Sequence, residues 1–290
     1  MILQNKIGVI VDSFNLPVRE GLLKAKDIGA DGVQIYAVAG EMDPEVLTGS
    51  ARQELKSYIN SLDLEISAIC GDLGGHGFQD KVQNKWKIEK SKRILDLALE
   101  LGTNIVTTHI GIVPHEQNEV YFEMQHACEE LSQYANSLGA HFAIETGPEK
   151  AEHLKSFLDT LSGQGVAVNY DPANLVMVTG DDPVQGVYTL RDYIVHTHVK
   201  DGVRYHETDP RDVYGAVGYE PMDHGKIAEM VASGQMFKEV PLGEGNVDFE
   251  AYFKALADIG YTGYLTIERE VGEQPEIDIR EAVKFINRYK

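Results

Sequence analysis

Three carboxylates and one imidazole stand at or near the ends of short apolar runs in the second half of the chain. Glu145 ends HFAIE, Asp171 ends VAVNYD, His198 lies near the end of IVHTHV, and Glu268 ends YLTIE. Each run is short, apolar and rich in β-branched or aromatic residues, which is typical of a strand. This hard ligand set suits Mn²⁺, Mg²⁺, Co²⁺ or Zn²⁺. We expect the four residues to hold one divalent metal ion, with open positions at which a substrate can chelate it.

The strands that must position these residues alternate with helical segments along the whole chain. IGVIVD and VQIYAV are the first predicted strands, a helical pattern follows Pro17, and longer patterns fill residues 84–101 and 120–138. Eight strands, each followed by a helix at roughly 30-residue spacing, predict an α/β protein with one (β/α)₈ TIM barrel domain over residues 1–290. An open doubly wound sheet is the alternative, but no GxGxxG motif follows the first strand. In a barrel, the four strand ends meet at one mouth.

The alternation breaks after the seventh predicted strand, in an inserted region of about residues 201–245. This region contains Tyr, Gly, Pro and Asp with little periodicity, apart from the helix-like stretch HGKIAEMVASG. A long segment that follows the carboxyl end of a barrel strand is typical of an active-site loop. We therefore expect the insertion to shape the substrate pocket.

Three residues near the predicted site have a structural interpretation. We expect His196 and His198 to point to opposite sides of their strand, so that His196 packs in a layer of the barrel while His198 binds the metal. Glu149 is predicted to be an acid at the N-terminus of a helix, although it could reach a substrate hydroxyl. Trp86 has the apolar spacing of a core residue within the helix 84–101.

Composition and charge exclude several partners. The chain has 26 Lys and Arg against 46 Asp and Glu, which gives a formal net charge of −20. Such a surface opposes binding to nucleic acid and to anionic membranes. The apolar runs are far shorter than a membrane span, and the N-terminus lacks the pattern of a signal peptide. Cys70 and Cys128 cannot form a disulfide framework, which is typical of a reducing compartment. We therefore expect a cytoplasmic protein, and the charge and the short apolar runs predict that it has no nucleic-acid or membrane partners.

The chain resembles the sugar phosphate isomerase/epimerase superfamily of xylose isomerase-like TIM barrels. The motifs that carry the resemblance are IETGPE, NYDPANL, HTHVKD and PLGEGNVDFEAYFKAL with GYTGYLTIERE, and the similarity covers nearly the whole chain. It implies that Glu145, Asp171, His198 and Glu268 bind Mn²⁺ or a similar ion, and that Glu145 and Glu268 form the acid/base pair. It also implies a sugar or keto-sugar substrate and a homodimer or homotetramer.

The expected chemistry is proton transfer beside a carbonyl. A cation stabilises the enediolate that forms when the proton leaves, one glutamate takes the proton, and a second returns it from the opposite face. We expect a metal-dependent isomerase or epimerase that acts on a sugar or sugar phosphate. The alternative is a dehydratase or lyase of the same superfamily that acts on a keto-sugar, such as an inosose dehydratase or a keto-glycoside eliminase.

Two further classes fit the sequence less well. An endonuclease IV-like DNA repair enzyme shares the barrel, but it needs three zinc ions and more histidines than these strand ends offer. The acidic charge also opposes phosphate binding. A sugar sensor without catalysis would not need the complete ligand set.

Five residues around the metal are expected to contact the substrate: His76, His109, Asn174, Lys200 and Arg204. Asn174 follows Asp171 by three positions, where the resembled ketose epimerases have a substrate-contacting histidine, so we expect a different sugar geometry. Arg204 follows His198 by six positions, where those enzymes have a substrate-binding arginine.

Overall fold

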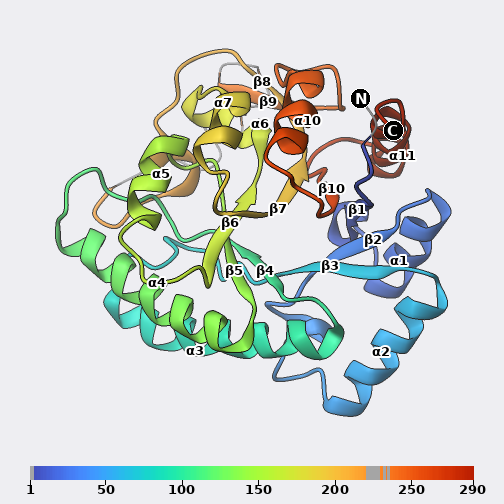
Figure 1. The fold of residues 1–290 in the computed structure, drawn as a ribbon, viewed down its shortest axis with the longest axis horizontal. Coiled ribbons are helices and arrows are strands. Elements are labelled where there is room, and N and C mark those ends of the chain that lie inside the picture. Colours follow the sequence, from blue (N-terminus) through green and yellow to red (C-terminus); the bar gives the residue numbers. More distant parts are fainter. Residues whose placement is uncertain (1–2, 220–228, 231–232, 234–235) are drawn as a thin grey trace.

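The β-branched runs form a closed barrel of eight parallel strands (Figure 1). The computed structural model describes residues 3–219, 229–230, 233 and 236–290. Around the barrel, β1 to β7 follow chain order, and β10 closes the ring between β7 and β1. The barrel strands are β1 (Ile7–Ile10), β2 (Gly32–Tyr36), β3 (Glu65–Cys70), β4 (Ile105–Thr108), β5 (His141–Glu145), β6 (Val166–Tyr170), β7 (Ile194–Val199) and β10 (Leu265–Ile267).

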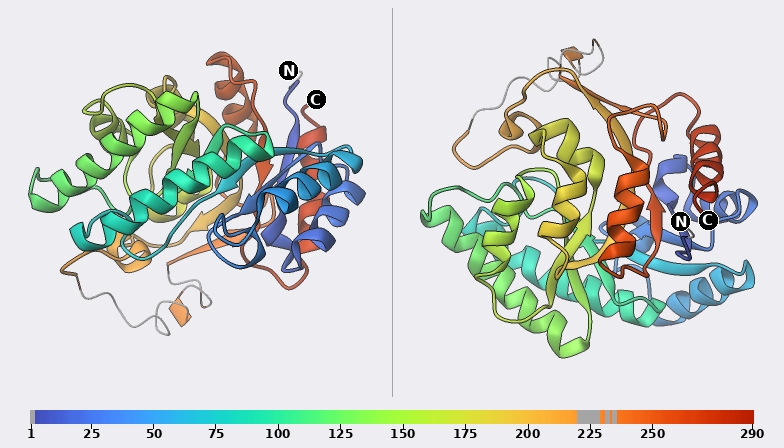
Figure 2. Two further views of the ribbon diagram at one scale, coloured as in Figure 1. Left: turned by 90° about the horizontal axis from the view of Figure 1, so that it is seen from below. Right: turned by 45° about the horizontal axis from the view of Figure 1, so that its top comes forward.

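Amphipathic helices cover the outside of the barrel, so the predicted (β/α)₈ TIM barrel is confirmed (Figures 1 and 2). The apolar faces of these helices pack on the strands in one continuous core. The longer helices are α1 (Val18–Asp27), α2 (Gly49–Ser61), α3 (Lys81–Leu101), α4 (Glu119–Leu138), α5 (Ala151–Leu158), α7 (Pro183–Thr189), α10 (Phe249–Asp258) and α11 (Pro275–Asn287). Short helical turns are η1 (Val11–Phe14), η2 (Gly40–Met42), α6 (Pro172–Asn174), η3 (Leu175–Thr179) and α8 (Pro210–Tyr214).

Capping residues decide where the two longest helices begin and end. The Asp80 carboxylate accepts hydrogen bonds from two backbone N–H groups, so α3 begins at Lys81, before the predicted start of the helix. Gly102 ends α3 in the left-handed conformation, with φ 107°. In the same way Asn118 caps the start of α4 and Gly139 its end.

The two ends of the chain lie side by side (Figures 1 and 2). The Leu3 N–H donates a hydrogen bond to the Tyr289 carbonyl at 3.1 Å. In the same region the first and last barrel strands pair in parallel, with Ile7 opposite Leu265. Among the described residues, no helix has both the length and the apolar character needed to cross a membrane.

The region after β7 forms a small two-stranded antiparallel sheet beside the barrel. Strand β8 (Asp201–Arg204) pairs with β9 (Phe237–Val240), and α8 lies between them in the chain. The helix-like stretch HGKIAEMVASG falls almost entirely outside the described residues.

Asp201, the first residue of β8, anchors this two-stranded sheet to the loop that follows β9. Its carboxylate is 1% exposed and accepts hydrogen bonds from four backbone N–H groups, those of Gly202, Gly243, Gly245 and Val247, at 2.8 to 3.2 Å. A carboxylate has enough lone pairs for four donors, whereas an amide side chain presents donors of its own on one side.

Asp201→Asn is therefore expected to lower the free energy of unfolding by about 2–4 kcal/mol, because buried N–H groups lose their acceptor. Urea denaturation followed by circular dichroism measures the change. Asp192→Asn, at an exposed carboxylate, is the matched control and should change stability by less than about 0.5 kcal/mol. Equal stability of the two variants would contradict this role of Asp201.

Candidate metal centre

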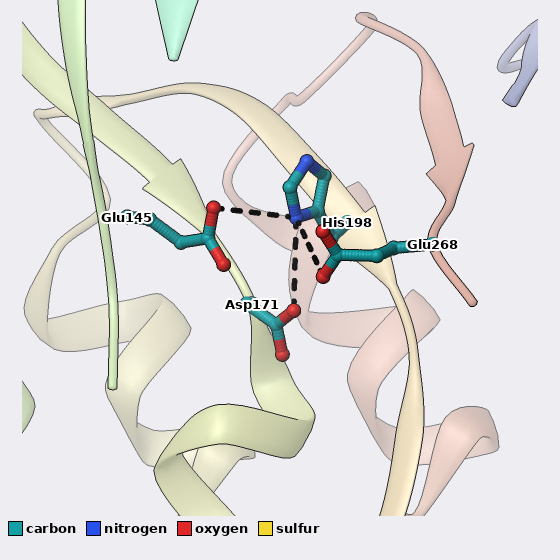
Figure 3. A group of neighbouring side chains, drawn as sticks. All are labelled: Glu145, Asp171, His198 and Glu268. Carbon is teal, nitrogen blue, oxygen red and sulfur yellow. Dashed lines mark ion pairs between the residues drawn. The ribbon is translucent and has the colours of Figure 1, made fainter. Parts of the chain in front are cut away.

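The four predicted ligands converge at one end of the barrel (Figure 3). They come from the last residue of β5, the residue after β6, the last but one residue of β7 and the residue after β10. All four side chains are buried, and one possible ligand atom from each lies within 4.8 Å of all the others. Parallel strands of a barrel present their carboxyl ends at the same mouth, so residues far apart in the sequence meet there. The members are Glu145, Asp171, His198 and Glu268.

The imidazole of His198 lies at the centre of the cluster (Figure 3). Its Nδ1 atom is 3.3 Å from Glu268 Oε2 and 3.6 Å from both Glu145 Oε2 and Asp171 Oδ2. On the other side of the ring, Nε2 lies 3.1 Å from the amide oxygen of Gln34. A hydrogen bond from Nε2–H to that oxygen directs the Nδ1 lone pair at the carboxylates, as metal-ligating histidines require.

Asp171 contributes a buried oxygen that accepts no hydrogen bond from the described residues. Its Oδ1 accepts a hydrogen bond from the Asn174 backbone N–H at 2.9 Å, which caps α6. Its Oδ2 has no hydrogen-bond partner among the described residues, although it is fully buried. Burial raises the pKa of Asp171 to about 6. An orphaned carboxylate oxygen that faces three other ligand atoms fits a site for a cation.

Glu145 is held by two amide side chains. Asn174 Nδ2 donates to Oε1 at 2.9 Å, and Asn169 Nδ2 donates to Oε2 at 3.1 Å. The Asn169 Oδ1 atom in turn lies 2.8 Å from Nδ1 of His196. This contact places the amide group of Asn169 toward Glu145. Side chains behind the ligands thus orient them, as is common around metal sites.

Glu268 is ionised because of a buried lysine. The Lys200 ammonium is 2.9 Å from Glu268 Oε2 and also pairs with Glu270. Burial opposes ionisation, but Lys200 and His198 hold the pKa of Glu268 well below its ordinary value. Likewise burial would lower the pKa of His198, but the Glu268 and Glu145 carboxylates raise it well above its ordinary value, so a metal ion would have to displace the proton from Nδ1 in order to bind there. The excess of buried negative charge is the environment that a divalent cation neutralises.

A cavity of about 910 Å³ opens above the cluster. This volume lies within the usual range for small-molecule sites. His109 and Asn174, two of the predicted substrate contacts, line it beside Glu145 and Glu268. Tyr214 of α8 also lines it, with its ring 5.5 Å from that of His109. The insertion therefore contributes a wall of the cavity.

His109 lies between two carboxylates at this cavity. Its Nδ1 atom is 3.2 Å from Asp72 Oδ2, and its Nε2 atom is 3.8 Å from Glu145 Oε1. Burial opposes protonation, but these two carboxylates raise the pKa of His109 to about 9. The Nε2 atom has no hydrogen-bond partner among the described residues. It is thus free to donate to a substrate oxygen.

The other three predicted substrate contacts lie elsewhere. Lys200 is 2% exposed and contacts Glu268 rather than the cavity. His76 is exposed in the loop after β3 and lies against Gly215 of the insertion. The Arg204 guanidinium lies against Gly180, and its Nε donates to the His206 carbonyl at 3.3 Å. None of the three lines the cavity above the cluster.

Two structural predictions were wrong. His196 and His198 do not point to opposite sides of β7: both are buried in the barrel, with ring centroids 5.7 Å apart. Residues two apart on a strand share a face, so His196 lies one layer below His198. Trp86 is not a core residue but is 48% exposed. The buried face of α3 passes through Asn84, Lys87 and Ile88, which turns Trp86 outward.

Glu149 lies just before α5 but is buried, and this burial shifts the pKa of its carboxyl group. It is 6% exposed, and its Oε2 accepts one long hydrogen bond, of 3.4 Å, from the Val113 N–H. Burial raises the pKa of Glu149 from 4.5 to about 8. Between these values the folded chain holds a proton that the unfolded chain releases. Glu149 therefore makes the protein less stable as the pH rises through this range.

Glu149→Gln is expected to remove this loss of stability, since the amide is neutral at every pH. The variant should exceed the wild type in free energy of unfolding by an amount that grows from pH 5 to pH 8, reaching on the order of a few kcal/mol. Urea titrations at several pH values measure it. Glu152→Gln, at an exposed position of α5, should leave the wild-type pH dependence unchanged. A constant difference between Glu149→Gln and the wild type would contradict the burial of an ionisable carboxyl.

Four residues of the site were not predicted: Gln34, Asp72, Asn169 and Tyr214. Two of them had a signal in the sequence. Gln34 is a polar residue within the apolar run VQIYAV, and Asn169 lies two positions before Asp171 and hence on the same face of its strand. Asp72 lies in the loop after β3 and Tyr214 ends the short helix α8, and neither segment is long enough for periodicity to mark the direction of a side chain.

Comparison with known proteins supports the family resemblance. The sequence model of the xylose isomerase-like TIM barrel family matches residues 22–289. Among curated proteins, the inosose dehydratase of Lacticaseibacillus casei is 27% identical over 161 residues, which are 54% of this chain and 49% of that protein. The match thus spans about half the length of this relative.

Solved structures share the fold over almost their whole length. A xylose isomerase domain protein from Planctomyces limnophilus has a TM-score of 0.77 and 25% identity, with 99% of this chain and 97% of that chain covered. The 3-keto-D-glucoside 4-epimerase from E. coli, in its apo form, has a TM-score of 0.71 and 18% identity, with 98% and 100% covered. The family match confirms the resemblance that the four strand-end motifs indicate.

Proposed function

The chain belongs to the xylose isomerase-like TIM barrel family, and we propose that it is a divalent-metal-dependent isomerase or epimerase of a sugar or sugar phosphate. The observation that carries this proposal is the buried cluster of three carboxylates and one imidazole at the barrel mouth. The Asp171 oxygen that has no hydrogen-bond partner among the described residues lies 3.6 Å from the Nδ1 atom of His198. A cation fits there, and the cavity above it has room for a sugar.

Glu145, Asp171, His198 and Glu268 would hold the ion. Three oxygen ligands and one nitrogen suit Mn²⁺ best, with Zn²⁺, Co²⁺ or Mg²⁺ as further candidates. When bound, the ion polarises the substrate carbonyl and stabilises the negative charge that develops on its oxygen.

Glu145 and Glu268 are the proposed acid/base pair. They approach the centre from β5 and from the end of β10, with β6 and β7 between these strands in the barrel. Lys200 keeps Glu268 ionised, so that its carboxylate is ready to accept a proton. The amide groups of Asn169 and Asn174 fix the position of Glu145. One glutamate removes the proton beside the carbonyl, and the other returns one from the opposite face of the sugar.

A keto-sugar dehydratase is the second candidate. Proton removal is the same, but a hydroxyl group then leaves from the neighbouring carbon. The match to inosose dehydratase favours this candidate. The raised pKa of His109 favours a role as proton donor, and its Nε2 atom, which has no hydrogen-bond partner among the described residues, could donate a proton to the departing oxygen.

Solvent-deuterium exchange into a panel of keto-sugars and keto-sugar phosphates tests the proposal. The protein is loaded with Mn²⁺, and a sample treated with a chelator is the control. Metal-dependent exchange with the sugar retained, or converted to an isomer, is expected for an isomerase or epimerase. Exchange with release of water indicates the dehydratase. If no sugar of the panel exchanges hydrogen, the proposed chemistry is wrong.

A further inference from the structure

Trp86 is the single tryptophan of the chain and lines a second hollow near the barrel mouth. Its side chain is 48% exposed, although tryptophan has a large apolar surface that proteins usually cover. The indole Nε1–H donates to Gln83 Oε1 at 2.6 Å, which fixes the orientation of the ring. The hollow is a groove of about 640 Å³ between the loops after β2 and β3 and the start of α3. An oriented aromatic ring is thus open to a ligand in this groove.

The groove adjoins the cavity above the metal centre. Asp72 lines both hollows, and it holds His109 at the edge of the larger one. The backbone N–H of Gly74 donates to the second oxygen of Asp72 at 2.9 Å, so this carboxylate is fixed between the two spaces. A ligand that is longer than one sugar ring could pass Asp72 and reach Trp86.

The chemistry of the groove fits a neutral polar ring. Its apolar part is formed by Val38 and Leu73 together with Trp86. Two of the cations that line it already face carboxylates: Lys90 pairs with Asp43, and Arg93 pairs with Glu45. Lys85 is the third cation of the lining, and Glu45, Asp72 and Glu89 are its carboxylates, so the groove has no net positive charge to favour a phosphate group. Its polar side chains offer donors and acceptors to hydroxyl groups. A pyranose ring has one apolar face for the indole and hydroxyl groups at its edge for such side chains.

We propose that the groove beside Trp86 binds the second ring of a neutral glycoside, while the first ring presents its reacting carbon to the metal centre. This inference rests on the proposed function and narrows its substrate class. The substrate is a keto-glycoside or keto-disaccharide, rather than a free monosaccharide or a sugar phosphate. Asp72 marks the boundary between the two sugar positions.

Tryptophan fluorescence tests binding without any need for catalysis. Because Trp86 is the single tryptophan, the emission of the protein reports on this groove alone. The probes are cellobiose, maltose, lactose and sucrose, compared with glucose and glucose 6-phosphate. We expect a saturable change of emission with at least one disaccharide, at concentrations at least about tenfold below those that glucose needs. If no disaccharide changes the emission up to its solubility, or if glucose 6-phosphate binds more tightly, the proposal is overturned.

Trp86→Ala tests the same groove in the reaction. With a keto-disaccharide the variant should raise KM about tenfold and leave kcat unchanged, because the indole is remote from the reacting carbon. With the matching keto-monosaccharide both constants should stay as in the wild type. Phe122→Ala is the control, since Phe122 is 51% exposed on α4 and does not line the groove.

The possible outcomes separate this inference from the proposed function. If Trp86→Ala affects both sugars equally, the groove is not a sugar position, while the proton-transfer chemistry stands. If no keto-sugar exchanges hydrogen at all, the proposed function fails, and the fluorescence titration alone decides the groove. A lower molecular mass of Trp86→Ala in light scattering would assign Trp86 to a contact between copies of the chain and overturn the inference.

Discussion

Replacing Glu145 or Glu268 by glutamine is expected to lower the conversion of one sugar into the other by about 10²- to 10⁴-fold. An amide has nearly the shape of the carboxyl group but cannot accept a proton. Each variant removes one of the two bases, and conversion needs both. The variants also lose one ligand charge, so they are compared with the wild type at saturating Mn²⁺, with bound metal measured by elemental analysis.

Hydrogen exchange distinguishes the two glutamates. With one base left, each variant should still exchange the hydrogen on the face of the remaining glutamate. The two variants should therefore catalyse hydrogen exchange in opposite isomers of the sugar. Glu244→Gln is the matched control, because Glu244 is an exposed residue at the same cavity. It should keep activity within about threefold of the wild type. Wild-type conversion by a metal-loaded Glu145→Gln or Glu268→Gln protein would show that these residues do not move the proton.

Lys200→Met is expected to lower the free energy of unfolding of the metal-free protein by about 3–5 kcal/mol. The methionine keeps most of the length and the apolar stem of lysine but removes the ammonium group. Burial would lower the pKa of Lys200, yet the Glu268 and Glu270 carboxylates raise it well above its ordinary value. Without that ammonium, His198 is left as the positive partner of Glu268 in the cluster, so the buried carboxylate is less well compensated or takes up a proton. The loss should be smaller with Mn²⁺, since a bound ion replaces the missing positive charge.

Urea denaturation with a chelator and with Mn²⁺ measures this loss. Lys155→Met is the control, because Lys155 forms an exposed pair with Asp159 on the surface of α5. Its effect should be at most about 1 kcal/mol. The double variant Lys200→Met/Glu268→Gln should recover part of the stability, since both members of the buried pair are then neutral. A Lys200→Met protein as stable as the control variant would mean that Lys200 does not stabilise the ionised Glu268.

The barrel and the metal cluster were predictable because both depend on local patterns. Strand and helix periodicity alternate along the chain, and eight such units close into one barrel. Glu145, Asp171 and Glu268 each end or directly follow an apolar run, so barrel closure alone brings them together. The exact start of α3 depended on a cap at Asp80, which is also a local feature.

The environment of the cluster depended on contacts between segments that are far apart in the sequence. Gln34 orients His198 across 164 positions, and Lys200 pairs with Glu268 across 68. The sequence predicts Lys200 and Arg204 as substrate contacts; that Lys200 is buried beside Glu268 and that the Arg204 guanidinium lies against Gly180 followed only from the tertiary structure. Trp86 follows a helical apolar pattern, yet the face that α3 buries is set by its neighbours in the barrel.

The sequence by itself determined the fold class, the family and the four residues that meet at the barrel mouth. Those features follow from hydrophobic periodicity and from the rule that parallel strands end at one mouth. Only the tertiary structure decided which polar side chains reach the cavity, which of them hold the ligands in place, and that Trp86 is open to solvent. The direction of a side chain on a loop, and the exact limits of the face that a helix buries, depend on the packing of distant elements, which periodicity within one segment does not fix.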